Sequence, residues 1–288
     1  MDAVSRIESS LADAVLCAEA AGAPPRLAAA MRHAVFPRGG RIRPRLTLAV
    51  AAACGEDRPA LCSAAAASIE LLHCASLVHD DLPCFDDAAT RRGKPSVHRA
   101  FGTPLAVLAG DALIVLAFQT LARAAPCAPD RLGPLLLVVG DGVGVPFGIV
   151  AGQAWECEPR ADLSEYQRQK TGSLFAAATI AGAAASGHAE PEAWRLLGDR
   201  LGEAYQVADD LRDAVEDAET LGKPVGVDKA LGRPSAVAEF GLHGAVARLR
   251  SLSEQAVAAI PPCQGRGMLH GLILAEAQRL LPRKLAAA

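Results

Sequence analysis

The chain has 288 residues and a formal net charge of -3, so it lacks the excess positive charge that nonspecific nucleic-acid binding requires. Hydrophobic residues make up 51% of the sequence and aromatic residues only 4%, a balance that favours packed helices of Ala, Leu and Val over strands. No stretch rich in Pro, Gly or Ser divides the sequence, and we therefore expect a single domain over residues 1–288.

Apolar residues recur at helical spacing along nearly the whole chain, and turns containing Gly or Pro separate the segments. In chain order, the predicted helices cover about residues 2–21, 25–35, 42–54, 58–81, 104–124, 131–157, 163–187 and 190–216, and two more lie near the C-terminus. Few stretches alternate as strands do. The pattern predicts an all-α fold built as a helical bundle.

Three features indicate a soluble protein of the cytoplasm. The eight cysteines include no CxxC pair, as expected of free thiols in a reducing compartment. The N-terminal residues lack the basic stretch and apolar run of a signal peptide. The apolar run 135–139 is followed by Gly140-Asp141-Gly142, so it falls short of the roughly 20 residues that a membrane span needs. We therefore expect no membrane span.

Four aspartates, Asp80, Asp81, Asp86 and Asp87, lie where the apolar helix predicted over residues 58–81 runs into a proline-containing break. Carboxylates at the C-terminus of a helix face the negative end of its dipole, which costs stability unless a cation compensates. Mg²⁺ binds proteins through one or two carboxylates together with substrate phosphates. The cluster therefore predicts a magnesium site, and a solvated acidic loop is the alternative interpretation.

A second acidic cluster, Asp209, Asp210 and Asp213, ends another apolar helical segment. Asp209 and Asp213 are four residues apart and share one helix face, where like charges repel unless a cation lies between them. Because the same arrangement occurs twice in one helical chain, coincidence becomes a weak explanation. The two clusters are suited to holding a diphosphate between them through Mg²⁺.

Basic residues accompany both clusters, as the excess charge of a diphosphate requires. Arg91 and Arg92 lie just beyond the first cluster, and Arg41 and Arg43 flank Ile42 after a Gly-Gly turn. Further cations stand in Lys170-Thr171-Gly172 and Gly222-Lys223-Pro224. Together with the aspartates, these residues indicate two anionic ligands, one bridged by metal and the other held by side chains.

In order and spacing, these motifs resemble the trans-polyprenyl diphosphate synthases, an all-helical family that condenses isopentenyl diphosphate with an allylic diphosphate. The resemblance spans nearly the whole chain and is carried by residues 39–44, 73–95, 109–111, 152–153, 170–172, 206–213 and 221–224. It implies an isoprenoid-synthase helical bundle around a central cavity, a homodimer, and a bacterial geranylgeranyl diphosphate synthase serving isoprene or carotenoid biosynthesis.

The resemblance also implies a role for each matched residue. Two or three Mg²⁺ ions would accompany the allylic diphosphate, bound by Asp80, Asp86 and Asp209 with Asp81, Asp210 and Asp213 as close supports. The allylic diphosphate would be held by Arg91, Lys170, Thr171, Gln206 and Lys223. Isopentenyl diphosphate would be held by Arg43, His73 and Arg92. The residues expected to be catalytic are Asp80, Asp81, Asp86, Asp209, Asp210 and Lys170.

The sequence departs from the family pattern at three positions. Gly40 occupies the place of a lysine in the isopentenyl site, which predicts weaker binding of that substrate. Glu156 stands where an aspartate is common, so the negative charge is kept there. Arg233 replaces a later lysine and keeps the positive charge. Without the resemblance, His73 alone would have been interpreted as a core histidine on an apolar helix.

Product length depends on what lies beneath the first cluster. Helix geometry places Ser76 and Ala75 about one turn before Asp80. Both are small, and in the resembled family small residues at this level let the product grow past fifteen carbons. The four residues between Asp81 and Asp86 are also similar to the bacterial and plant type of geranylgeranyl diphosphate synthase. We therefore expect a twenty-carbon product.

Three alternatives stay open at the level of sequence. The chain length could differ, as in a farnesyl diphosphate synthase. A noncatalytic partner subunit is favoured by Gly40 but opposed by the intact aspartates. A terpene cyclase shares the ionisation chemistry but takes no second diphosphate, so the set Arg43, His73 and Arg92 favours a synthase over a cyclase.

Overall fold

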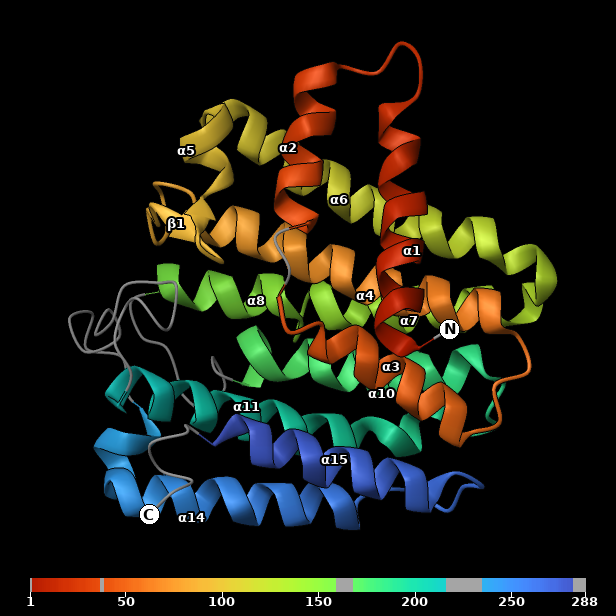
Figure 1. Ribbon diagram of the computed structural model, residues 1–288, viewed down its shortest axis with the longest axis vertical. Helices are drawn as coiled ribbons and strands as arrows, with labels where there is room; N and C mark the ends of the chain where they lie inside the picture. Colours follow the sequence, from red (N-terminus) through yellow and green to blue (C-terminus); the bar gives the residue numbers. More distant parts are fainter. Residues whose placement is uncertain (1, 37–38, 159–167, 216–234, 282–288) are drawn as a thin grey trace. The chain divides into compact units, whose positions relative to one another are not determined.

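The computed structural model describes residues 2–36, 39–158, 168–215 and 235–281, and this part of the chain is almost entirely helical (Figure 1). It falls into two compact units. The first unit consists of Met1–Val139 and Ala181–Ala189, and the second of Gly140–Ile180 and Glu190–Ala288. Helices α7 (Leu132–Val143) and α10 (Ser173–Ala185) contribute residues to both units. The all-α class is confirmed, and the single domain stays a prediction.

The first unit is built around α4. In chain order it contains α1 (Ala3–Leu16), η1 (Cys17–Glu19), α2 (Pro25–Val35), α3 (Ile42–Ala53), α4 (Pro59–Asp80), β1 (Thr90–Arg91), β2 (Lys94–Pro95), α5 (Val97–Phe101), α6 (Thr103–Ala124), η2 (Ala125–Cys127) and η3 (Pro129–Arg131). Helix α4 packs against α1, α2, α3 and α6, and Figure 1 shows α6 running alongside it. Most of its side chains are buried, including the alanine run 64–67, and small side chains allow close helix packing.

A short antiparallel hairpin follows α4 in the first unit. Thr90 of β1 pairs with Pro95 of β2, and Arg91 pairs with Lys94. The turn between the strands has positive φ at Arg92 and Gly93. The hairpin thereby returns two arginines of the predicted site toward the helix that carries the first aspartates.

The second unit is organised around α11. It contains α8 (Ile149–Ala154), η4 (Trp155–Cys157), the π-helical turn η5 (Arg168–Gly172), η6 (Pro191–Trp194), α11 (Arg195–Val215), α14 (Ala236–Ala258) and α15 (Arg266–Leu280), together with most of α10. Helix α11 packs along α14, and their contact is an apolar cluster that includes Leu211, Leu249 and Leu252. The turn η5 contacts both α8 and α11, and Thr171 of η5 hydrogen-bonds to Gln206 of α11.

Most predicted helices agree with the structure, and one prediction was wrong. The helix predicted over 25–35 matches α2, and the one over 58–81 differs from α4 by one residue at each end. The single helix predicted over 131–157 is instead α7 and α8, separated by residues 144–148. Gly144, Pro146 and Gly148 lie in this break, and neither residue type sustains a helix.

By length and composition, two helical segments within the described residues could cross a membrane, Pro59–Asp80 and Thr103–Cys127. The apolar window of the first is 78% buried inside the protein, as expected of a core helix, whereas that of the second is 39% buried. The sequence estimate counted only uninterrupted apolar residues and therefore missed both segments.

Candidate active site

The first aspartate cluster lies at the C-terminal end of α4, as predicted. Asp80 is the last residue of the helix and Asp81 its C-cap. The chain then turns back, because the backbone N–H of Asp86 donates to the carbonyl of Asp80 at 3.0 Å. Burial raises the pKa of the Asp81 carboxyl, and the charges of Asp80 and Asp86 add to the effect while Arg91 opposes it. The three carboxylates are therefore close enough to repel, which favours a bound cation.

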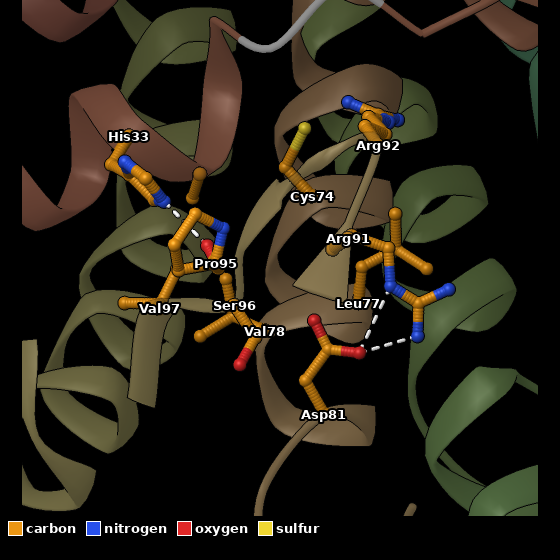
Figure 2. Close-up of a pocket in the computed structure, with 11 residues that line it drawn as sticks. His33, Cys74, Leu77, Val78, Asp81, Arg91, Arg92, Pro95, Ser96 and Val97 are labelled. Carbon is orange, nitrogen blue, oxygen red and sulfur yellow. Dashed lines mark hydrogen bonds and ion pairs between the residues drawn. The ribbon is translucent and has the colours of Figure 1, made fainter. Parts of the chain in front are cut away.

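Arg91 on β1 pairs with the first cluster. Its Nε donates to Oδ1 of Asp81 at 2.9 Å, its Nη2 donates to the same oxygen, and Nη2 lies 3.8 Å from Oδ2 of Asp80. Figure 2 shows this ion pair at one end of a pocket, with Cys74 and Arg92 at the other. A predicted ligand of the allylic diphosphate thus lies against the predicted metal carboxylates.

The donor set of the first cluster fits Mg²⁺, which prefers carboxylate oxygens. Among the residues that the structure describes, no three His, Cys, Asp or Glu side chains already converge on one point. Such a cage is not required, because Mg²⁺ keeps water ligands and takes the remainder from carboxylates and substrate phosphates. The Asp80 side chain is 15% exposed and Asp86 is half-buried, so both carboxylates are accessible to an ion.

Asp87, the last aspartate of the cluster, anchors the loop instead. Its backbone has a left-handed φ of 44°. Its Oδ1 lies 3.0 Å from Arg99 Nη2 and 3.4 Å from His98 Nε2, and the other ring nitrogen of His98 is 3.0 Å from Ser96 Oγ. Sequence reasoning missed Arg99 and His98. Their position in the sequence, a few residues after Arg91 and Arg92, was the only signal that could have pointed to them.

The three residues predicted for isopentenyl diphosphate come together in the first unit. Arg43, at the start of α3, lies 3.5 Å through Nη1 from Nε2 of His73 on α4. Burial, followed by the charges of Arg43 and Arg92, holds the pKa of His73 well below its ordinary value, so the neutral ring can accept from Arg43. Arg92 lies against Gly39, where an added Cβ would be 2.7 Å from the guanidinium carbon. A side chain at position 39 would therefore have to displace the end of the Arg92 side chain.

Lys170 is oriented by a carboxylate in the second unit. Its Nζ donates to Oε1 of Glu156 at 2.6 Å, and Oε2 of Glu156 accepts from Nε2 of Gln153 at 2.9 Å. The sequence showed Glu156 only as a replacement for the usual aspartate. The structure identifies it as the residue that holds the predicted lysine.

A hydrogen-bonded chain links η5 to α14 through the second aspartate cluster. Thr171 Oγ1 donates to Oε1 of Gln206 at 3.0 Å, and Gln206 Nε2 donates to Oδ1 of Asp210 at 3.1 Å. Oδ2 of Asp210 accepts from the backbone N–H of Ala236, the first residue of α14, at 2.7 Å. Because both oxygens of Asp210 accept protein hydrogen bonds, a supporting role suits it better than direct metal binding.

The remaining residues of the second cluster share one face of α11. Asp209 lies 3.5 Å from Arg212, and its side chain is 36% exposed. Asp213 follows one turn later on the same helix. Lys223 lies outside the described residues.

The two residues predicted to set product length differ in burial. His73, Ser76, Leu77 and Asp80 are all half-buried and follow the three- and four-residue spacing of one helix face. Ser76 therefore lies on the same stripe of α4 as Asp80, the predicted metal ligand. Ala75 is 1% exposed and belongs to the core.

Comparison with known proteins places the chain in a family. Residues 24–260 match the polyprenyl synthetase family. The chain belongs to that family. It is 55% identical to the geranylgeranyl diphosphate synthase of Cereibacter sphaeroides over 98% of both chains, and 50% identical to that of Rhodobacter capsulatus over 96% of this chain and 95% of the relative.

Two solved structures are also similar to this chain. A geranyltransferase from Helicobacter pylori, complexed with magnesium and isoprenyl diphosphate, superposes with a TM-score of 0.80 at 27% identity, covering 97% of this chain and 98% of that one. A geranylgeranyl pyrophosphate synthetase from Pyrococcus horikoshii gives 0.78 at 28% identity, covering 97% and 96%.

In this polyprenyl synthetase, the predicted residues fall into two groups. The first unit carries Arg43, His73, Asp80, Asp81, Asp86, Arg91 and Arg92 on or beside α4. The second carries Lys170, Thr171, Gln206, Asp209, Asp210 and Asp213 on η5 and α11.

Proposed function

We propose that the chain is a geranylgeranyl diphosphate synthase, a Mg²⁺-dependent prenyltransferase that condenses isopentenyl diphosphate with an allylic diphosphate. The observation that carries the proposal is the 55% identity along 98% of both chains to a relative with that name. The aspartates at the end of α4, with Arg91 beside them, supply the matching chemistry within this chain.

The allylic diphosphate is the substrate that ionises. Asp80, Asp86 and Asp209 would hold two or three Mg²⁺ ions, which when bound supply positive charge against the departing pyrophosphate. The diphosphate charge that the metal ions do not neutralise would be met by side chains. These are Arg91, Lys170, Thr171, Gln206 and Lys223. Glu156 orients Lys170, so this donor is placed before the substrate binds. Thr171 donates its hydroxyl proton to Gln206, which fixes its side chain beside the site.

Isopentenyl diphosphate is the nucleophilic substrate and needs no metal in this proposal. Arg43, His73 and Arg92 would hold its diphosphate, and the neutral ring of His73 leaves the two arginines as the cations of the site. Its double bond attacks the allylic carbon, a carbon–carbon bond replaces the carbon–oxygen bond, and a proton is lost. No protein nucleophile takes part.

Two further properties belong to the proposal. A twenty-carbon product is supported by the small side chain Ser76, one turn before Asp80 on the same helix face. A homodimer is supported by α6, whose Leu108 and Val115 are 51% and 55% exposed and lie on one helix face. A cytoplasmic location belongs to the same proposal. The product would supply an isoprenoid pathway such as carotenoid formation.

The decisive experiment is an elongation assay. Purified protein is incubated with Mg²⁺, labelled isopentenyl diphosphate and farnesyl diphosphate, and the dephosphorylated products are separated by chromatography. We expect a labelled twenty-carbon alcohol and no product when Mg²⁺ is chelated. Dimethylallyl diphosphate is tested as the allylic primer in a parallel reaction. Absence of elongation from both primers would refute the synthase function. Products that stop at fifteen carbons from dimethylallyl diphosphate would refute only the chain length.

A further inference from the structure

A buried carboxylate with no predicted role, Glu70, lies among the arginines of the first unit. Its side chain is 2% exposed, and it stands on α4 three residues before His73, on the same side of the helix. A buried carboxylate is costly unless charged or hydrogen-bonding partners compensate for its lost hydration. The partners of Glu70 therefore indicate what keeps it there.

One oxygen of Glu70, Oε1, faces three side chains. It accepts from Arg41 Nη1 at 2.6 Å, lies 3.7 Å from Arg92 Nη2, and is 3.9 Å from the sulfur of Cys74. Burial, followed by the charge of Glu70, raises the pKa of Cys74 to about 11, so its thiol stays protonated and can donate. Figure 2 shows Cys74 and Arg92 at the same end of the pocket.

Arg41 transmits the position of Glu70 to the start of α3. Its backbone is left-handed, with φ 49°, and its side chain is 3% exposed. Besides Glu70, the guanidinium donates to Glu8 on α1 at 2.9 Å and to the carbonyl of Val35 on α2 at 2.8 Å. One side chain thus ties three helices to the residue that precedes α3, two positions before Arg43. Arg41 is structural and is not exposed to an anion.

We propose that Glu70 is a positioning residue for the second-substrate site, holding Arg92 directly and Arg43 through Arg41. The inference rests on the proposed function, in which Arg43, His73 and Arg92 bind isopentenyl diphosphate. Guanidiniums gathered around one pocket repel, and a carboxylate between them fixes their places before the ligand arrives, which reduces the ordering cost of binding. Because Gly40 replaces a cationic lysine of the isopentenyl site, the affinity for isopentenyl diphosphate depends more on how the remaining arginines are placed.

The test compares Glu70→Gln with Glu8→Gln. Each variant removes one charged partner of Arg41, but only Glu70 also faces Arg92. Binding of isopentenyl diphosphate alone is measured by titration calorimetry, where no allylic substrate is present and no reaction occurs. We expect Glu70→Gln to weaken this binding by about tenfold to a hundredfold, the range for loss of a charged hydrogen-bonding partner. We expect Glu8→Gln to lower the thermal midpoint while keeping the wild-type affinity.

Kinetics supply a second readout. In Glu70→Gln the KM for isopentenyl diphosphate should rise while the KM for the allylic diphosphate stays at the wild-type value, a split that general destabilisation does not produce. Glu70→Asp keeps the charge and shortens the side chain by one methylene, so it should fold and recover part of the affinity. It also serves as the test variant if Glu70→Gln does not fold.

Unchanged isopentenyl diphosphate binding in folded Glu70→Gln would overturn the positioning role alone, as would equal losses in Glu70→Gln and Glu8→Gln. Wild-type protein that binds no isopentenyl diphosphate would overturn the proposed function and this inference together. The wild-type titration therefore separates the two failures.

Discussion

Lys170 in the second unit is positioned through both its ammonium group and its backbone. Glu156 accepts its hydrogen bond at 2.6 Å, and Gly152 on α8 lies directly against its backbone. A Cβ added at Gly152 would be 2.4 Å from the amide nitrogen of Lys170, nearer than atoms can approach. The absence of a side chain at Gly152 therefore lets η5 pass close to α8. This close packing also sets the position of the Lys170 ammonium, which is predicted to bind the allylic diphosphate.

A single methyl group should test this arrangement. We expect Gly152→Ala to shift η5, to destabilise the fold by about 1–3 kcal/mol through overpacking, and to raise the KM for the allylic diphosphate by about tenfold or more, because small displacements of positioning groups are costly. Steady-state kinetics and thermal denaturation measure the two effects. An unchanged allylic KM would contradict the role given to Gly152.

The matched control is Gly140→Ala on α7. A Cβ at Gly140 would meet nothing within 4 Å, so the methyl group should be tolerated. Replacing glycine by alanine inside a helix should add about 0.5–1 kcal/mol of stability and leave the kinetics unchanged.

At the scale of elements, α4 carries predicted residues of both substrate sites on one stripe. His73, Ser76 and Asp80 lie along its half-buried face, while Ala75 turns into the core at 1% exposure. A growing isoprenoid tail near Asp80 would therefore meet Ser76 before Ala75. Burial distinguishes two residues that the sequence treated as equivalent.

Bulky replacements on α4 should have different effects at adjacent positions. We expect Ser76→Phe to keep the fold and to shorten the main product below twenty carbons, because the ring occupies the face below the carboxylates. We expect Ala75→Tyr to cost about 1–3 kcal/mol of stability by overpacking the core. Product chromatography measures the chain length, and thermal denaturation measures the stability of each variant. Shortening by Ala75→Tyr, with unchanged products from Ser76→Phe, would show that Ala75 faces the tail.

The sequence predicted those elements whose signals are local. Helix α4 was found within one residue because its apolar run ends at the aspartates, and the motif fixed Asp80 at its terminus. The link between Glu70 and Arg41 was not predictable, because the partners are 29 residues apart and meet only through tertiary packing. The hairpin of β1 and β2 was also missed, since two-residue strands carry no periodicity.

At the scale of the molecule, α6 has an apolar surface that the described chain leaves open. The window within Thr103–Cys127 has a mean hydropathy of 2.0 but is only 39% buried, in contrast to the core helix α4. Leu108 and Val115 are seven residues apart and therefore project from one face. An exposed apolar face of this kind marks either a partner protein or a lipid surface. A second copy of the chain would cover this face symmetrically, because in an isologous two-fold contact the same patch of each copy meets its counterpart.

Introducing charge on this face should separate the two explanations. We expect the wild-type protein to sediment as a dimer and Val115→Glu to sediment as a monomer, because a buried unpaired carboxylate at a two-fold contact is strongly unfavourable. Leu196→Glu on α11 is the control, since Leu196 is exposed to a similar degree, at 49%, and lies in the second unit. It should leave the dimer intact. A wild-type protein that is monomeric in solution but floats with phospholipid vesicles, and a Val115→Glu variant that does not, would assign the face to a lipid surface and refute the dimer.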